Sequence, residues 1–380
     1  MKAILYNFKP IFVLIFFLPA LFGQEKEEID VHEFTILYNI ETTLVKHQGK
    51  TGTCWTFATQ SFLETELIRM GIGEYDLSEM YMVRNIYPIK AEKYIRYHGL
   101  TSFDQGGQAH DVLIAMDKYG LVPEEIYPGK SSADELHNHM EMVAVLKGSM
   151  DAIISTKGKI SDNWKYVCGS VLDIYLGENS ESFYYNGKEY TPRSFADELA
   201  INSDDYIEFT SYMRYPYYEQ SILEVPDNWT NNEYYNIPID NLIEVIDNAI
   251  KNGYSVVWDG DTSEKTFYRK KGYAVIPVDD EKDGDDKELT EPEREKVITQ
   301  EMREKTFENF LTTDDHLMHI IGLAENQEGT KFYHTKNSWG TKYKYDGYWY
   351  MSEPFVRLKT IAIMVHKDAV PENIKAKLGI

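Results

Sequence analysis

The sequence predicts an α+β fold in which the helices come first and the strands last. Three observations indicate this class. Helical patterns dominate up to about residue 250, β-like runs alternate with turns after it, and no internal repeat is evident. With 43% hydrophobic and 14% aromatic residues among 380, the chain can bury a substantial core. We therefore expect a single domain over 24–380, with a helical half and a sheet-rich half.

The helical half, about 35–130, opens with an extended segment that runs into a loop of small residues. The run from Trp55 to Met70 has apolar residues at helical spacing, and Gly71 ends it. Further helical patterns follow at 77–99 and before the stop at Gly120.

The middle of the chain, about 131–250, is expected to be a mainly helical insertion that ends in an amphipathic helix before Gly253. The last part, about 251–380, contains short runs rich in β-branched and aromatic residues, bounded by turns. Strands are expected at 254–261, 316–325, 330–340, 346–353 and 360–367. The charge run from Asp279 to Lys296 is expected to be a solvated surface insertion.

The first residues, 1–23, are typical of a secretory signal peptide. Lys2 and Lys9 precede an apolar run of about a dozen residues, which is shorter than the roughly 20 that span a membrane. We expect export to the periplasm or the extracellular space, with no stable membrane insertion after cleavage; an uncleaved anchor is the alternative. The formal charge of −23 opposes binding to nucleic acid, whose phosphates select for Lys and Arg.

The two cysteines have different surroundings. Cys168 lies on the apolar face of a helical pattern, which is typical of a buried structural thiol. Cys54 follows the small residues of "GKTGT" and begins a helix, where the helix dipole lowers the pKa of a thiol. Export favours paired cysteines, but these settings argue against a Cys54–Cys168 disulfide.

Cys54 has the surroundings of a nucleophile. Gln48 lies upstream in the same loop, and its side-chain amide can donate to an oxyanion that forms beside the sulfur. A nucleophilic thiol also needs a base that is held by a third group. Far along the chain, "DDHLMHIIGL" carries His316 and His319 on an expected strand, and "KNSWG" follows with Asn337 and Trp339. The Asn side chain can fix the ring of a His, and the Trp can exclude water.

The stretches "QGKTGTCWTFA", "DDHLMHIIGL" and "KNSWGTKYKYDGYWYM" resemble a papain-fold cysteine peptidase. Within this fold the chain is most similar to the bleomycin hydrolase and aminopeptidase C branch, on "FDQGGQAHDVLIAMDKYGLVPEEIYPG" and "KNGYSVVWDGD" among others. The similarity runs from about residue 35 to the end. It implies a helical half and a β-barrel-like half that flank an active-site cleft, with helical insertions.

The resemblance also implies roles for single residues. Cys54 matches the nucleophile, Asn337 the orienting Asn, Trp339 its shield and Gln48 the oxyanion-hole residue. The catalytic His of papain-like enzymes lies six residues before a small residue, and counting back from Gly322 gives His316. Residues three apart on a strand point to opposite faces, so His319 should face away.

The pair Gly106–Gly107 resembles the strand edge that binds the substrate backbone, and a simple tight turn is the alternative. The implied activity is aminopeptidase hydrolysis of short peptides through a thioester, without a metal or cofactor. The implied assembly is a homo-oligomer, a hexamer.

Two departures from the branch change the expectations. Its cytosolic members close the cleft with a C-terminal arm, whereas this chain is expected to be exported and to lack the arm after "DAVPENI". Either endopeptidase action with the same triad follows, or Ile380 reaches the cleft by another path. Three other readings remain: an inactive papain-fold peptide-binding protein, a transglutaminase-like acyl transferase, and a metal site built from Asp314, Asp315, His316 and His319.

Overall fold

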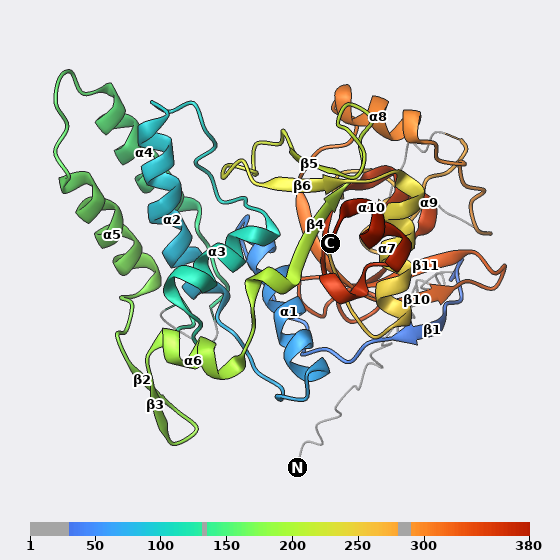
Figure 1. The fold of residues 1–380 in the computed structure, drawn as a ribbon, viewed down its shortest axis with the longest axis horizontal. Coiled ribbons are helices and arrows are strands. Elements are labelled where there is room, and N and C mark those ends of the chain that lie inside the picture. Colours follow the sequence, from blue (N-terminus) through green and yellow to red (C-terminus); the bar gives the residue numbers. More distant parts are fainter. Residues whose placement is uncertain (1–29, 131–134, 280–289) are drawn as a thin grey trace, which may run out of the picture.

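The computed structural model describes residues 30–130, 135–279 and 290–380. The expected signal peptide and much of the charge run lie outside these residues. The described chain folds into two parts, a group of helices and a twisted sheet with its own helices, which are seen side by side in Figure 1. None of its helices is long and apolar enough to cross a membrane.

The helical part contains the helices that come first in the described chain. Its helices are α1 (Cys54–Arg69), α2 (Glu79–Arg96), α3 (Ala109–Tyr119), α4 (Met140–Ser155), α5 (Asn163–Leu176) and α6 (Pro192–Leu199). A hairpin of β2 (Phe183–Tyr185) and β3 (Lys188–Tyr190) precedes α6. The ends follow ordinary capping chemistry: the Ser78 side chain accepts from Tyr81 N–H at the start of α2, and Gly120 follows the end of α3.

The sheet part holds the remaining strands. They are β1 (Thr35–Asn39), β4 (Tyr206–Thr210), β5 (Glu219–Ile222), β6 (Glu233–Asn236), β7 (Val256–Gly260), β8 (Phe267–Tyr268), β9 (Tyr273–Ala274), β10 (His316–Glu325), β11 (Lys331–Lys336), β12 (Tyr348–Ser352) and β13 (Thr360–His366). The order is β5-β6-β4-β13-β7-β10-β11-β12-β9-β8, with β1 paired to β10. This path does not close, so the expected barrel-like half is an open, strongly twisted sheet in the described residues.

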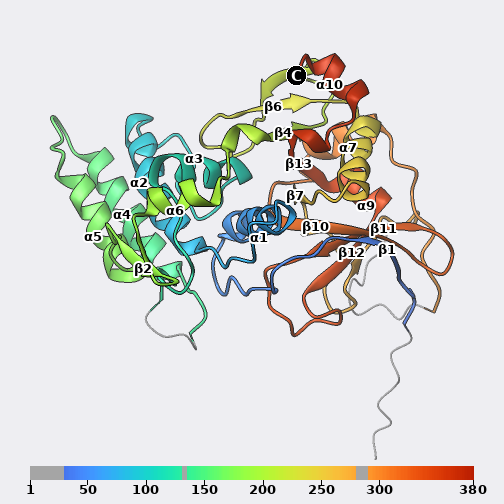
Figure 2. The same cartoon turned by 60° about the horizontal axis from the view of Figure 1, so that its bottom comes forward.

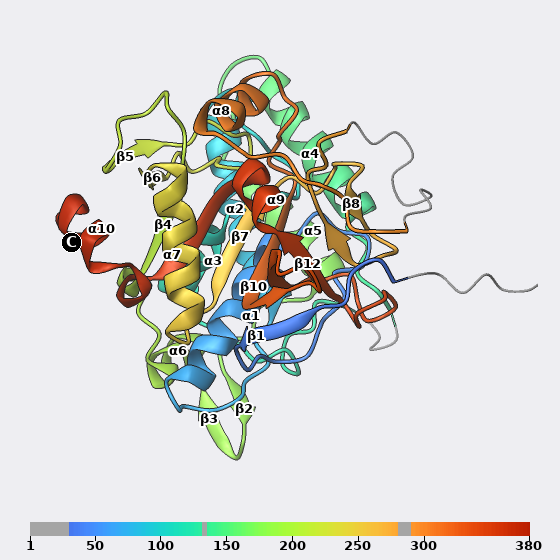
Figure 3. The same cartoon turned by 90° about the vertical axis from the view of Figure 1, so that its right-hand side faces the viewer.

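Four helices belong to the sheet part: α7 (Ile239–Lys251), α8 (Gln300–Glu308), α9 (Glu353–Lys359) and α10 (Glu372–Leu378). Side chains of β7 alternate between its two faces, as the pleat requires. Val257 packs in the core around α1, whereas Val256 and Trp258 pack in the core around α7. Figures 2 and 3 show the same layers, with α1 and α7 on opposite sides of β7 and β10.

Helix α1 lies between the two parts, and this position explains its sequence. Every residue from Cys54 to Leu67 is buried, including Glu64 and Glu66. The helix therefore has no solvent face, and its small and polar residues pack against the sheet on one side and α2 and α3 on the other. Its N-terminus consequently lies where the two parts meet.

Two expectations need correction. The insertion at 131–250 is helical as far as Leu199, but residues 206–236 contribute β4, β5 and β6 to the main sheet. Polar and Tyr-rich connections concealed these short strands. The C-terminal helix α10 packs with α7, and Lys377 Nζ donates to Tyr218 Oη at 3.0 Å. Ile380 therefore lies on the far side of the sheet from α1 and does not reach Cys54 (Figure 3).

Candidate active site

The nucleophile candidate sits at the N-terminus of α1. Cys54 is the first residue of the helix and is 7% exposed. The first N–H groups of a helix have no partner within it and can therefore donate to an anion. The backbone of Leu317, on β10, acts to lower the pKa of the Cys54 thiol, although burial, the larger cause, raises it. The sulfur thus lies beside the residue that follows His316.

The base candidate and its orienting group meet directly. His316 begins β10, and its Nε2 lies 2.9 Å from Asn337 Oδ1. Trp339 packs against the ring, with centroids 4.7 Å apart. His316 and Asn337 are 5% and 3% exposed, so little water reaches the bond. Because Asn337 occupies Nε2, the other ring nitrogen, Nδ1, is the one left to exchange a proton with a thiol.

His319 has a different neighbourhood. Its Nδ1 lies 2.9 Å from Ser61 Oγ on α1, and its ring packs edge-on against Phe62. The two histidines therefore point to opposite sides of β10, as the strand argument required. A metal site that includes both is incompatible with this geometry, and no group of metal-binding side chains occurs elsewhere in the described chain.

Gln48 is fixed by two hydrogen bonds. Its Oε1 accepts from Ser338 Oγ at 2.6 Å, and its Nε2 donates to Thr51 O at 2.8 Å. An amide nitrogen carries two hydrogens, so one remains for a substrate oxygen. Ser338 lies next to Asn337 and also donates its backbone N–H to Asn337 Oδ1 at 2.7 Å. Ser338 thereby links the oxyanion candidate to the base; sequence reasoning missed it, although its place inside "NSW" is a usable signal.

The glycine pair lies beside the same turn. Gln105 Oε1 accepts from Gly52 N–H at 2.9 Å, which ties the Cys54 loop to the segment that contains Gly106 and Gly107. A Cβ on Gly106 would lie 1.8 Å from Asp227 Oδ2, and one on Gly107 would lie 2.6 Å from Asp111 Oδ2. Only glycine fits at either position. The structure does not identify a substrate contact at this pair.

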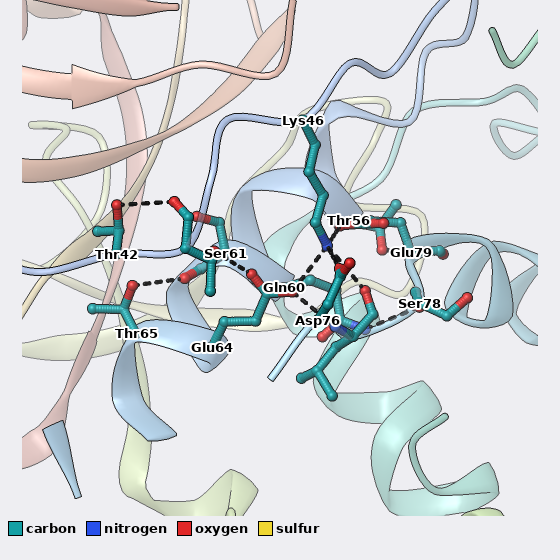
Figure 4. A network of polar contacts seen from close by, with 12 residues as sticks. Thr42, Lys46, Thr56, Gln60, Ser61, Glu64, Thr65, Asp76, Ser78 and Glu79 are labelled. Carbon is teal, nitrogen blue, oxygen red and sulfur yellow. Dashed lines mark hydrogen bonds and ion pairs between the residues drawn. The ribbon is translucent and has the colours of Figure 1, made fainter. Parts of the chain in front are cut away.

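A buried ion network supports the loop before Gln48 (Figure 4). The Lys46 ammonium lies 2.9 Å from Glu64, 2.6 Å from Asp76 and 2.6 Å from Glu79. It joins the loop to α1, through Glu64, and to the start of α2, through Glu79. Burial raises the pKa of Glu79 to about 7, although Lys46 opposes this. Sequence reasoning missed Lys46. The signal was its partner Glu64, a charged residue within the run of apolar and small residues that forms α1.

Burial controls the resting charge of the candidate pair. It raises the pKa of the Cys54 thiol to about 12, and nearby Asp259, Asp227 and Asp314 act in the same direction. It lowers the pKa of His316 to about 4, against the hydrogen bond to Asn337. Burial therefore opposes the charged form of both side chains, the thiolate and the imidazolium. Cys168 is a free, buried thiol on α5, away from these groups, and it forms no disulfide with Cys54.

Comparisons with known proteins agree with this arrangement. Residues 175–379 match the Peptidase C1-like family, a range that contains His316, Asn337 and Trp339. Bleomycin hydrolase of Mus musculus is 25% identical, covering 91% of this chain and 85% of the relative. Aminopeptidase E of Lactobacillus helveticus is 24% identical, with 88% and 84% covered, and aminopeptidase C of Streptococcus thermophilus is 22% identical, with 89% and 83% covered.

Among solved structures, pepW from Lactobacillus rhamnosis HN001 superimposes with a TM-score of 0.70 at 19% identity, covering 91% of this chain and 84% of that one. This likeness extends over both the helical and the sheet part. It shows that the whole described arrangement is a papain-like α+β fold.

Proposed function

The chain belongs to the Peptidase C1-like family and is a cysteine-type peptidase, and we propose that Cys54, His316 and Asn337 carry out its reaction. One observation supports these roles above the others. The ring of His316 is held by Asn337, under Trp339, on the strand whose next residue, Leu317, shares a core cluster with Cys54 and acts on its thiol. The proposed nucleophile, base and orienting group thereby come from three distant segments.

In the proposed reaction, His316 Nδ1 takes the thiol proton as Cys54 attacks the peptide carbonyl carbon. The carbonyl oxygen becomes an oxyanion, which accepts from Gln48 Nε2 and the Cys54 backbone N–H. His316 then gives its proton to the leaving amine, and the acyl group remains on sulfur as a thioester. Water attacks the thioester with His316 as base, which releases the acid and restores the thiol.

Asn337 contributes by binding the protonated form of the ring. A charged imidazolium donates more strongly to Oδ1 than a neutral imidazole does, so the bond stabilises the state in which His316 carries the extra proton. This favours proton transfer from a thiol whose burial alone would disfavour ionisation.

We propose that the enzyme acts as an aminopeptidase on short peptides. Relatives named as aminopeptidases align with about nine tenths of this chain. The test is hydrolysis of matched peptides with a free and with an acetylated N-terminus, by wild type and by Cys54→Ala. We expect the free peptides to be cleaved faster and Cys54→Ala to be inactive. Equal rates on both peptides would favour the endopeptidase alternative, and activity in Cys54→Ala would refute the nucleophile.

Export and assembly are further proposals. We propose that residues 1–23 direct export and are removed, which N-terminal sequencing of the protein from culture fractions would test. A full-length N-terminus in the cytosolic fraction would contradict it. The homo-oligomer that the resemblance implies can be tested by light scattering, where a monomer at working concentration would contradict it.

A further inference from the structure

Three carboxyl groups that the proposed mechanism does not use lie beside the nucleophile. Asp227 is in the loop after β5, Asp259 is in β7 and Asp314 comes two residues before His316. All three act on the charge of the Cys54 sulfur. Asp259 also lies opposite Leu317 in the β7–β10 register, and Leu317 shares a core cluster with Cys54.

The three carboxyl groups form one cluster. Asp259 and Asp314 act on each other's charge, and Asp227 acts electrostatically on both. Gln108 Nε2 donates to Asp314 Oδ2 at 2.8 Å and so fixes its orientation. The three come from segments far apart in the sequence, so the fold, rather than a charge run, brings them together.

Asp259 is the member of the cluster that lacks a partner. It is 3% exposed, and no N–H or O–H donor of the described chain bonds either of its oxygens. Neighbouring carboxyl groups, those of Asp314 and Asp227 among them, raise its pKa further in the direction in which burial raises it. The ammonium of Lys90 acts on Asp227, but it already donates to Asp104 O at 2.7 Å and Gly106 O at 2.5 Å. A buried carboxyl group without a donor is costly, which indicates a place for a positively charged ligand.

The cluster also adjoins empty space and the expected substrate edge. Asp314 lines a cavity of about 590 Å³, whose walls also include Pro226, the residue before Asp227, and the charged pair Arg214 and Glu224. Asp227 packs directly on the Cα of Gly106, since a Cβ there would lie 1.8 Å from Oδ2. The cavity therefore borders the cluster at Asp314, and Asp227 borders the glycine pair.

The covalent structure of a peptide fixes where its N-terminal charge must lie. The α-amino nitrogen of the first residue is two bonds from the carbonyl carbon that the sulfur attacks, a distance of about 2.5 Å. An anion that binds this ammonium group must therefore lie close to Cys54 on the acyl side. The cluster of Asp227, Asp259 and Asp314 meets this requirement.

We propose that Asp227, Asp259 and Asp314 bind the α-ammonium group of the substrate, so that the enzyme selects peptides with a free N-terminus. The proposal rests on the aminopeptidase function above. The same carboxyl groups could instead pair with the cationic side chain of the residue before the cleaved one, in a longer peptide. Both ligands share the chemistry of an organic cation, and substrates can separate them.

The experiment compares the wild type with Asp259→Asn and Asp314→Asn on four coumarin amides. These are alanyl, acetyl-alanyl, acetyl-leucyl-alanyl and acetyl-arginyl-alanyl substrates. The matched control is Asp315→Asn, the adjacent carboxylate, which accepts from Thr262 N–H at 2.9 Å. We expect kcat/KM for the alanyl substrate to fall about 10- to 100-fold in the two variants, mostly through KM, with the acetylated substrates changed little.

Other results would overturn the proposal. A loss confined to the acetyl-arginyl-alanyl substrate would assign the cluster to a side chain instead, and an equal loss on all four substrates would assign it a structural role. A binding measurement separates this proposal from the proposed function. In Cys54→Ala, calorimetry with alanyl-alanine amide should detect binding that Asp314→Asn removes and that N-acetylation of the peptide prevents. Binding without wild-type hydrolysis would refute the catalytic proposal alone.

Discussion

Replacing Asn337 by alanine removes the acceptor for His316, and the structure sets the size of the loss. The bond is 2.9 Å long and Asn337 is 3% exposed, so water is a poor replacement. When His316 is protonated during the reaction, the bond is one to a charged group and contributes about 1.5–3 kcal/mol. At about 1.36 kcal/mol per factor of ten, we expect kcat/KM to fall about 10- to 150-fold.

The pH profile should move as well. The hydrogen bond to Asn337 raises the pKa of His316, against burial, which lowers it. Without that bond the imidazolium loses its proton at lower pH. The acid limb of the kcat/KM profile, where a protonated ring can no longer take the thiol proton, should therefore shift to lower pH in Asn337→Ala.

The assay is steady-state hydrolysis of an alanyl coumarin amide between about pH 3 and pH 9, with folding checked by circular dichroism across this range. Asn373→Ala serves as the control, because Asn373 lies on α10 and bonds only an exposed carboxylate, Glu244, among the contacts described. A folded Asn337→Ala protein whose kcat/KM falls less than about threefold, with an unmoved profile, would refute the assignment of Asn337.

The remaining predictions separate structural from catalytic groups. His319→Ala should lower the free energy of unfolding by about 1–3 kcal/mol, because Ser61 loses its partner, with kcat/KM within about threefold of wild type; a folded but inactive variant would contradict the choice of His316. Lys46→Met should lower the free energy of unfolding, measured by urea denaturation, by about 3–5 kcal/mol, because it leaves the buried Glu64 and Glu79 without a counter-charge. Lys46→Arg should restore part of this stability, and an unchanged urea midpoint in Lys46→Met would disprove the prediction. Cys168→Ala should lower the free energy of unfolding by about 1 kcal/mol, because a buried side chain is shortened, and should leave peptidase activity intact. Loss of activity in a folded variant would contradict a purely structural role for Cys168.

The long elements could be predicted from the sequence because each repeats a clear period. The helix after Cys54, the strand from His316 and the strand from Thr360 all lie within a few residues of their expected bounds. The strands at 206–236 could not be predicted in this way. They are four or five residues long, and β4 and β6 pair in parallel although a loop and β5 separate them along the chain. Their pairing depends on tertiary contacts, which no local pattern records.

The candidate site divides in the same way. Strand alternation, a local rule, predicts that His316 and His319 face opposite sides, and the spacing implied by the papain-like resemblance selects His316. The Lys46 network and the carboxyl cluster could not be foreseen. Asp227 and Asp259 each resemble an ordinary polar residue in its own segment, and in the sequence Asp314 suggests only a metal ligand. Only the fold shows that the three lie together, with Asp259 buried, and that they act on Cys54.

The most direct test of Cys54 as the nucleophile is covalent labelling with a thiol-directed epoxide, followed by peptide mapping. We expect one label per chain, on Cys54, with activity lost in proportion to labelling and with a peptide substrate slowing the reaction. Cys54→Ala should be folded, unlabelled and inactive. Labelling of Cys168 that abolishes activity, or full activity in Cys54→Ala, would contradict the account.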